Sequence, residues 1–171
     1  LARADFVGHG YAKGVPMGGD LRKVGAGETA TKSPGFLVRA ARSPDGANLD
    51  RVQMVKGWLD ATGATHEAVY DIAWSGNRKP GKNGKLPPVG NTVNVKEASY
   101  SNRIGTPVLE AYWQDPAFKP AEKAFYYVRV LEIPPPRWTT HDAKIFGVEL
   151  PKGAPVSIQD RAYTSPIWYS P

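Results

Sequence analysis

The side chains best suited to hydrolytic or metal chemistry are three histidines, His9, His66 and His141. None lies within four residues of another, and the chain has no His-x-His or His-Glu-x-x-His motif, so local metal-ligand spacing is absent. His66 opens a predicted strand, and His141 lies beside Asp142 in a predicted helix start, so both positions indicate structural roles. His9 lies between two glycines, whose flexible backbone would let it reach a ligand. A stand-alone hydrolase would need His9, Asp20 and His141 to converge in the folded chain.

Motifs of the other common catalytic classes are also missing from the sequence. The chain has no cysteine, which excludes disulfides, Cys-ligated zinc, iron–sulfur clusters and thiol nucleophiles. It has no Gly-x-Ser-x-Gly nucleophile elbow, no Gly-Lys-Ser/Thr phosphate loop and no Gly-x-Gly-x-x-Gly after a strand. We therefore expect no catalytic residue, no cofactor and no bound metal in this chain, with His9, Trp138 and His141 as the only ligand-binding candidates.

Five tryptophans suggest a different class of protein, a module that stacks sugar rings on exposed aromatic side chains. They are Trp58, Trp74, Trp113, Trp138 and Trp168. Four of them lie at or near the ends of predicted strands, where a large ring would cap a core. Trp138 follows three prolines and an arginine, and it is the tryptophan that we most expect to be exposed. Sugar recognition by Trp138 and its neighbours is therefore one alternative function.

The overall composition is typical of one globular domain. Of the 171 residues, 41% are hydrophobic and 22% are charged, and no apolar run approaches the roughly 18 residues of a membrane helix. The 18 glycines and 16 prolines disfavour long helices. The net charge is +6, and four basic residues lie in residues 77–85, a Pro- and Gly-containing segment without aromatic side chains. We interpret that segment as a solvated loop and expect no nucleic-acid partner and no membrane insertion.

Short runs of β-branched and aromatic residues, separated by turn residues, predict a chain of antiparallel strands. The predicted strands are residues 36–42, 49–59, 66–74, 92–95, 108–113, 125–133 and 167–169. The first three follow one another through the turns 43–46 and 61–64, so we interpret them as a meander. Residues 125–133 are apolar on nearly both faces, which is typical of a central strand.

Helical signals are few. Asp115 and Pro116 could begin one turn within residues 115–123, with Asp115 as the cap. Two turns are predicted within residues 140–147, where Thr140 would cap the helix and Gly147 would end it. Together these elements predict an all-β fold, a mainly antiparallel β-sandwich of immunoglobulin-like or jelly-roll-like type with one or two short helices, in a single domain over residues 1–171.

Several longer strings in the sequence resemble one bacterial family. They are residues 11–21 (YAKGVPMGGDL), 44–58 (PDGANLDRVQMVKGW), 69–81 (VYDIAWSGNRKPG), 84–93 (GKLPPVGNTV), 125–133 (FYYVRVLEI), 136–140 (PRWTT) and 162–169 (AYTSPIWY). The strings are similar to the C-terminal region of an uncharacterised family with a domain of unknown function. That family is related to the polymerase-and-histidinol-phosphatase (PHP) superfamily of metal-dependent phosphoesterases.

The resemblance implies a longer parent protein, with an export signal and a metal-binding α/β barrel before this region. The chain begins with Leu1 rather than Met, and we expect it to be a piece of such a protein. The barrel's His-x-His and Asp-x-His motifs do not occur here, so none of its ligands can be assigned to this chain. The resemblance implies that the divalent metal lies in the upstream barrel, which would be the partner of this domain. We therefore expect a non-catalytic accessory domain of a periplasmic or exported hydrolase.

Overall fold

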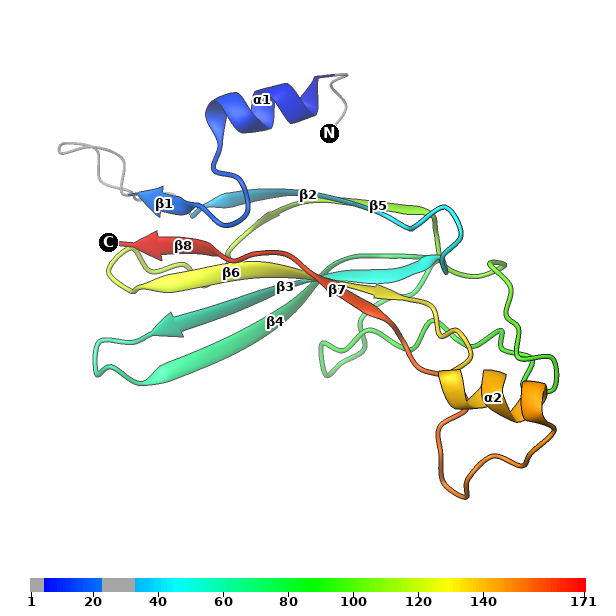
Figure 1. Cartoon of the computed structure of the whole chain (residues 1–171). Helices are drawn as coiled ribbons and strands as arrows, with labels where there is room; N and C mark the ends of the chain where they lie inside the picture. The colour runs from blue at the N-terminus through cyan, green and yellow to red at the C-terminus, as the bar shows by residue number, and fades with distance from the viewer. Residues whose placement is uncertain (1–4, 23–32) are drawn as a thin grey trace.

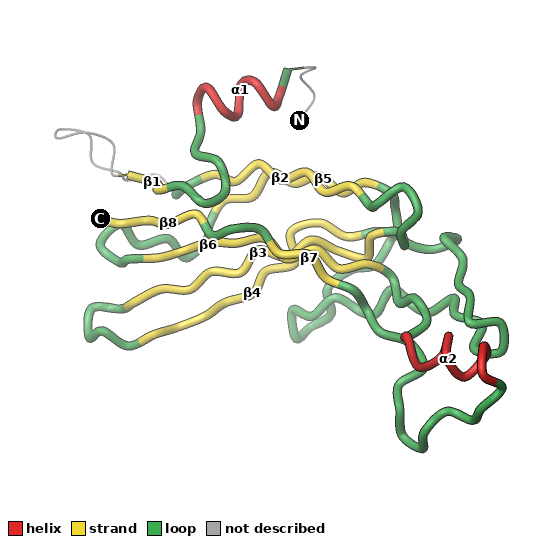
Figure 2. Tube along the Cα trace, viewed as in Figure 1, coloured by secondary structure: helices red, strands yellow, loops and turns green. Residues whose placement is uncertain are grey.

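The computed structural model describes residues 5–22 and 33–171, in which eight strands form two sheets and two short helices lie outside them (Figure 1). The strands are β1 (Asp20–Arg22), β2 (Gly35–Ala41), β3 (Leu49–Leu59), β4 (Thr65–Trp74), β5 (Val108–Gln114), β6 (Ala124–Glu132), β7 (Arg161–Tyr163) and β8 (Ile167–Ser170). The helices are α1 (Phe6–Lys13) and α2 (Trp138–Phe146). Figure 2 shows that long loops make up much of the half that contains α2. The prediction of a mostly β protein with short helices is confirmed.

The larger sheet has six strands in the order β1-β8-β6-β3-β4, and β7 pairs with β6 as well. Strands β7 and β8 lie one after the other along the same edge of β6, opposite residues 129–131 and 124–126 respectively. Strand β6 therefore has partners on both sides, which confirms the predicted central strand. The pairing of β1 with β8 is parallel and the other pairings are antiparallel, so the sheet is mixed.

The smaller sheet, β2 and β5, packs on one face of the larger one. Phe36 and Leu109 from the small sheet share a buried cluster with Val52, Met54 and Tyr126 from the large sheet. We call the covered face of the large sheet the inner face and the opposite one the outer face. The predicted meander of residues 36–74 is wrong at its first step, because β2 pairs with β5 rather than with β3. The turn at 43–46 thus carries the chain from one sheet to the other.

The hairpin between β3 and β4 forms where the sequence predicts it. The Asp60 carboxylate accepts hydrogen bonds from the Thr62 and Ala64 amides and from the Thr62 hydroxyl, at 2.6–3.0 Å. Gly63 has φ +84°, a conformation that glycine adopts without strain. His66, at the start of β4, contacts the other Asp60 oxygen at 2.7 Å and stacks on Trp58. His66 is exposed there, which confirms its predicted edge position.

Two predicted elements do not form. Residues 92–95 contain a single bridge from Asn94 to Ser99 and no strand, because polar side chains there bond to nearby backbone in turns. Residues 115–123 contain turns and no helix. Asp115 accepts a bond from the Ala117 amide at 2.9 Å, two residues on, which fixes a turn in place of a helical start.

Helix α2 differs from its prediction at the N-terminal end. Helix α2 begins at Trp138, two residues before the predicted start, so Thr140 is a buried residue inside it and not its cap. The Thr140 hydroxyl donates to the Val156 carbonyl oxygen at 2.7 Å. Gly147 ends α2, as predicted, and it adopts the left-handed conformation. Helix α1 and the three-residue strands β1 and β7 were not predicted.

Candidate functional site

The outer face of the large sheet carries a row of four aromatic rings. We call Trp168, Phe125, Tyr127 and Tyr163 the aromatic row. Neighbouring ring centroids lie 5.3 Å (Trp168–Phe125), 6.4 Å (Phe125–Tyr127) and 6.2 Å (Tyr127–Tyr163) apart. The planes of Phe125 and Tyr127 differ by only 10°. The two ends of the row are the more open, with Trp168 48% and Tyr163 56% exposed.

Strand alternation and pairing explain why these rings share one face. Phe125 and Tyr127 are two residues apart on β6, so both point to the outer side. Trp168 on β8 pairs directly with Phe125, and Tyr163 on β7 lies diagonally from Tyr127. On the other side of β6, Phe125 pairs with Gly57 of β3. A Cβ atom at Gly57 would overlap the Phe125 ring, so the ring lies against the glycine backbone.

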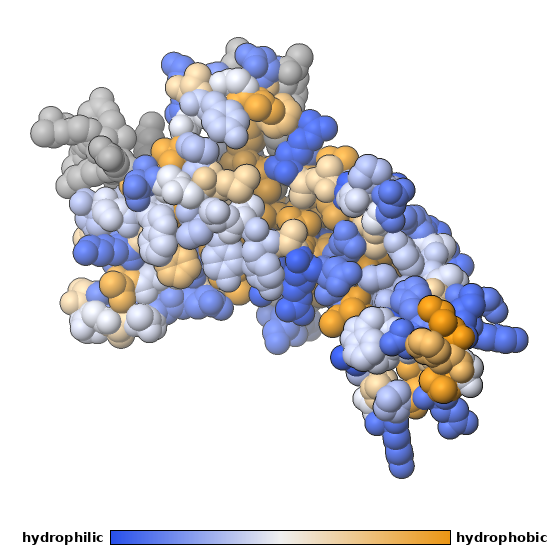
Figure 3. All heavy atoms as spheres, viewed as in Figure 1, coloured by the Kyte–Doolittle hydropathy of each residue, from blue (hydrophilic) through white to orange (hydrophobic). Residues whose placement is uncertain are grey.

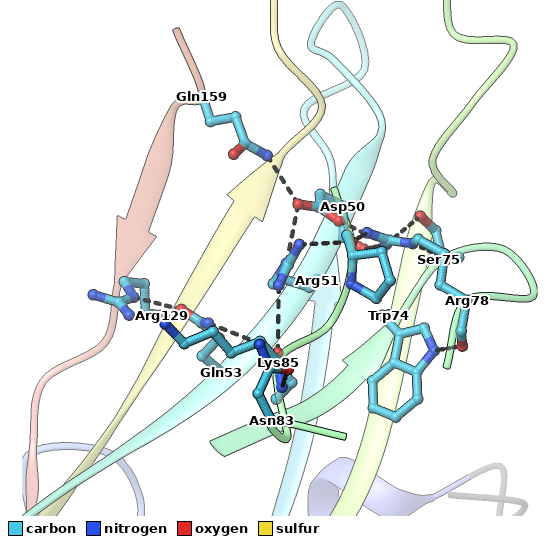
Figure 4. A network of polar contacts seen from close by, with 12 residues as sticks. Asp50, Arg51, Gln53, Trp74, Ser75, Arg78, Asn83, Lys85, Arg129 and Gln159 are labelled. Carbon is cyan, nitrogen blue, oxygen red and sulfur yellow. Dashed lines mark hydrogen bonds and ion pairs between the residues drawn. The ribbon is translucent and has the colours of Figure 1, made fainter. Parts of the chain in front are cut away.

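Polar side chains occupy the outer face beyond the aromatic row (Figure 4). Gln53 accepts a hydrogen bond from Arg129 Nε at 2.7 Å and donates one to Asp71 at 2.8 Å. Asp71 also forms an ion pair with Arg51 Nη1 at 3.3 Å. In the described part of the chain, the two Nη groups of Arg129 have no hydrogen-bond partner. The Gln53 side chain is thus held between the Arg129 guanidinium and the Asp71 carboxylate.

A second polar cluster is centred on Asp50, which is buried at the start of β3 (Figure 4). Its carboxylate contacts Arg78 Nη2, Arg51 Nε and Gln159 Nε2 at 2.6, 3.1 and 2.9 Å. Arg78 also donates to the Pro87 carbonyl oxygen at 2.9 Å. These contacts connect the loops after β4 and before β7 to the sheet. Arg78, which the sequence places in a solvated loop, is therefore largely a structural residue.

A third cluster lies on the inner face, where Lys56 and Asp115 are both almost completely buried. Lys56 Nζ is 2.6 Å from Asp115 Oδ2 and 2.8 Å from the Ala117 carbonyl oxygen. The Tyr126 hydroxyl donates to the same carboxylate at 2.7 Å. Burial, the hydrogen bond to Asp115 and the charge of Asp115 raise the pKa of the Tyr126 hydroxyl. Burial and the same charge raise the pKa of Tyr70. The cluster ties the loop after β5 to β3 and β6.

A cleft of about 640 Å³ lies at one end of the large sheet. Strands β3, β4, β6 and β8 supply its lining, which includes Phe125 and Trp168 of the aromatic row. Glu67, His66 and Lys123 add polar groups to the lining. The cleft is therefore continuous with one end of the aromatic row. Its volume lies within the range of small-ligand pockets.

The histidines and Asp20 singled out from the sequence are dispersed. His9 lies exposed on α1, Asp20 lies exposed on β1, and His141 lies exposed on α2, at the opposite end of the molecule from α1 (Figure 1). Residues 5–22 and 33–171 contain no group of three His, Asp or Glu side chains that could hold a metal ion. The stand-alone hydrolase reading requires that convergence, and the fold does not bring these residues together.

Trp138 is the most exposed of the five tryptophans, as predicted, at 65%. The Arg137 guanidinium lies over its ring at 5.4 Å. Trp138 is the first residue of α2, on which Ile145 and Phe146 are also exposed. Apolar side chains gather on this helix in Figure 3. The row of four rings lies instead on the outer face of the large sheet. Trp168 was expected to cap a core, and strand alternation turns it outward while its neighbour Tyr169 is buried.

The comparisons with known proteins give one match. A family model described as "Protein of unknown function (DUF3604)" matches residues 1–171. The comparisons with curated proteins and with solved structures found no match. Among the helices in the described part of the chain, none has the length and apolar character needed to cross a membrane.

Proposed function

We propose a function from the premise that the chain belongs to the DUF3604 family of proteins of unknown function. In this proposal, the chain is a non-catalytic accessory domain of an exported metal-dependent hydrolase. The catalytic barrel, with its divalent metal, would precede it in the same protein and would be related to PHP phosphoesterases. The accessory domain would stabilise that barrel or help to shape its substrate cleft. The packing of two sheets around one core favours a sandwich of immunoglobulin-like or jelly-roll-like type.

The observation that carries this proposal is the exposure of apolar side chains on and after α1. Tyr11 is 70% exposed, Val7 and Met17 are also exposed, and no side chain of α1 is buried by the described chain. A helix of eight residues is marginal in water unless its apolar side packs on another surface. The Phe6 ring of α1 lies 5.3 Å from the Arg39 guanidinium of β2. A barrel domain upstream of α1 would supply the missing surface.

The side chains that could act as acids or bases support a non-catalytic role. Asp50 is held by Arg51 and Arg78, and Asp115 by Lys56 and Tyr126. Each carboxylate is buried, and its contacts join a loop to a strand. General acid–base catalysis needs a group within hydrogen-bond reach of substrate. Because these groups already neutralise one another in the interior, stability is the function that they serve best.

The test compares this chain alone with the longer protein that contains the barrel. We expect hydrogen exchange across Phe6–Lys13 to slow at least tenfold when the barrel is present, while exchange in β6 stays the same. Tyr11→Ser should abolish that protection. Ile145→Ser, at a residue of similar exposure on α2, is the matched control and should leave it unchanged. Equal exchange of α1 with and without the barrel would contradict the proposal.

A further inference from the structure

We propose that the outer face of the large sheet binds a neutral polysaccharide chain, with its sugar rings stacked along the aromatic row. This inference goes beyond the accessory role and does not depend on it. The site differs from Trp138, where the sequence alone suggests sugar binding. It consists of the aromatic row, the Gln53–Arg129 pair beside it and the cleft at its other end.

The geometry of the rings suits an extended ligand. Three successive centroid separations of 5.3–6.4 Å leave no gap in the row, so a chain could contact one ring after another. Aromatic faces carry partial negative charge and attract the weakly positive C–H groups of a sugar ring. Tyr and Trp provide this contact area with little loss of side-chain freedom, because each has only two rotatable side-chain bonds.

The rings are also held in position before any ligand arrives. The Phe125 ring lies against the Gly57 backbone, and Tyr127 packs nearly parallel to it. Val55 of β3 lies between Val69 of β4 and Tyr127 of β6 on the same face, and it is only 1% exposed. A preorganised platform loses little entropy on binding. The more exposed rings at the two ends are the ones that a ligand would cover most.

Polar groups at both ends of the row fit hydroxyl groups. At one end, Arg129 has two Nη groups without partners in the described part of the chain, and Gln53 fixes its orientation. At the other end, the cleft adds Glu67 as an acceptor and Lys123 as a donor beside Trp168. Sugar hydroxyls both donate and accept, so they match this mixture of groups. Binding sites of this type combine apolar area with a few placed polar groups.

The charge pattern favours a neutral chain over a polyanion. Arg51, the basic residue beside Gln53 on β3, is already paired with Asp50 and Asp71. Glu67 offsets the charge of Lys123 in the cleft lining. A nucleic acid or acidic polymer needs a continuous basic surface to neutralise its charges. On the outer face, Arg129 and Arg161 lie near Tyr163 and Lys123 lies near Trp168, so the aromatic row separates these basic residues and they form no continuous surface.

The experiment measures binding of soluble hexasaccharides of cellulose, xylan, mannan and chitin by titration calorimetry and tryptophan fluorescence. We expect at least one of them to bind, and Trp168→Ala and Tyr163→Ala each to weaken that binding at least tenfold. Trp168→Phe should restore most of it, because the aromatic face is kept. Melting curves of each variant show that it is folded. Trp138→Ala and Tyr112→Ala, at exposed rings outside the row, are the matched controls and should bind as the parent does.

Four outcomes would overturn the proposal. They are no binding of any of these sugars, binding that survives both row variants, and loss of binding in Trp138→Ala alone. The fourth is preferred binding of heparin or single-stranded DNA with a steep salt dependence. None of these results bears on the exchange of α1, so the accessory role stands or falls separately.

Discussion

The two faces of the large sheet are built from the same strands, and they differ in how far their side chains are covered. On β3 and β6, Lys56 pairs with Tyr126, and the next pair along, Gly57 with Phe125, points to the other side. The inner pair is sealed under the small sheet with Asp115 and has its charges satisfied within the chain. The outer pair supports a partly exposed row of rings. The inner face therefore provides stability, and the outer face is the one on which we propose that a saccharide binds.

The largest expected loss of stability comes from a substitution on the inner face. Lys56→Met leaves the Asp115 carboxylate buried without its cation, and should lower the free energy of unfolding by about 3–5 kcal/mol. Urea denaturation followed by tryptophan fluorescence would measure this loss. Adding Asp115→Asn should recover part of it, because the double variant buries no lone charge. A loss below about 1 kcal/mol for Lys56→Met would mean that the cluster is open to water.

The next largest loss of stability is expected in the cluster around Asp50, which holds two loops against the large sheet. Arg78→Ala removes the ion pair to Asp50 and a bond to Pro87, and should cost about 2–3 kcal/mol. Hydrogen exchange should rise in residues 75–90 before it rises in β3. Lys82→Ala, in the same basic loop and exposed, is the matched control with a near-zero effect. If the two variants were equally stable, Arg78 would be a solvated loop residue, as the sequence alone predicts.

A smaller loss of stability is expected at Gly57, against which the Phe125 ring of the outer face packs. Gly57→Ala places a Cβ atom into the Phe125 ring and should destabilise the chain by about 1–3 kcal/mol through overpacking. The displaced ring should also weaken saccharide binding. Gly10→Ala, on α1 with open space around it, should cause no loss of stability. Unchanged binding in a folded Gly57→Ala variant would show that the position of Phe125 does not matter for the ligand.

The smallest effect concerns pH at the β3–β4 turn. The Thr62 hydroxyl and His66, with the turn amides, lower the pKa of Asp60 well below its usual value of 3.8. Because the folded-state pKa lies below the unfolded one, this contribution to stability is full above about pH 4 and is lost as pH falls further. Melting curves between pH 5 and pH 2 should show a slightly shallower decline for Asp60→Asn than for the parent. Parallel curves would contradict this assignment.

The long strands could be predicted because their residue types alone indicate them. Residues 49–59, 66–74 and 125–133 are rich in β-branched and aromatic residues, and each forms close to its predicted bounds. The pairing could not be predicted so well, since a turn at 43–46 fits either a hairpin or a crossing between sheets. Strands β1 and β7 have three residues each and depend on partners far along the chain. Helix α1 contains two glycines, which lower its intrinsic helix propensity.

The candidate site was only partly accessible from the sequence. The alternation of Phe125 and Tyr127 on one strand was visible, and it could have indicated that the two rings share a face. Tyr163 and Trp168 join them only through the pairing of β7 and β8 with β6. Lys56 gave no signal at all in its strand, because its burial depends on Asp115, 59 residues later, as the salt bridge shows. Exposure of Trp138 was predicted correctly, and the exposure of Trp168 was not.

The parallel pairing of β1 with β8 has a consequence for how the protein is made. Asp20 lies opposite Trp168, so β1 leaves the ribosome long before its partner strand exists. At usual rates of synthesis the interval is roughly 7 to 30 seconds. During that time β1 has no edge to join, while the β3–β4 hairpin can already form from neighbouring residues. Completion of the large sheet is therefore a late event, and it occurs only when the last few residues of this region have been added.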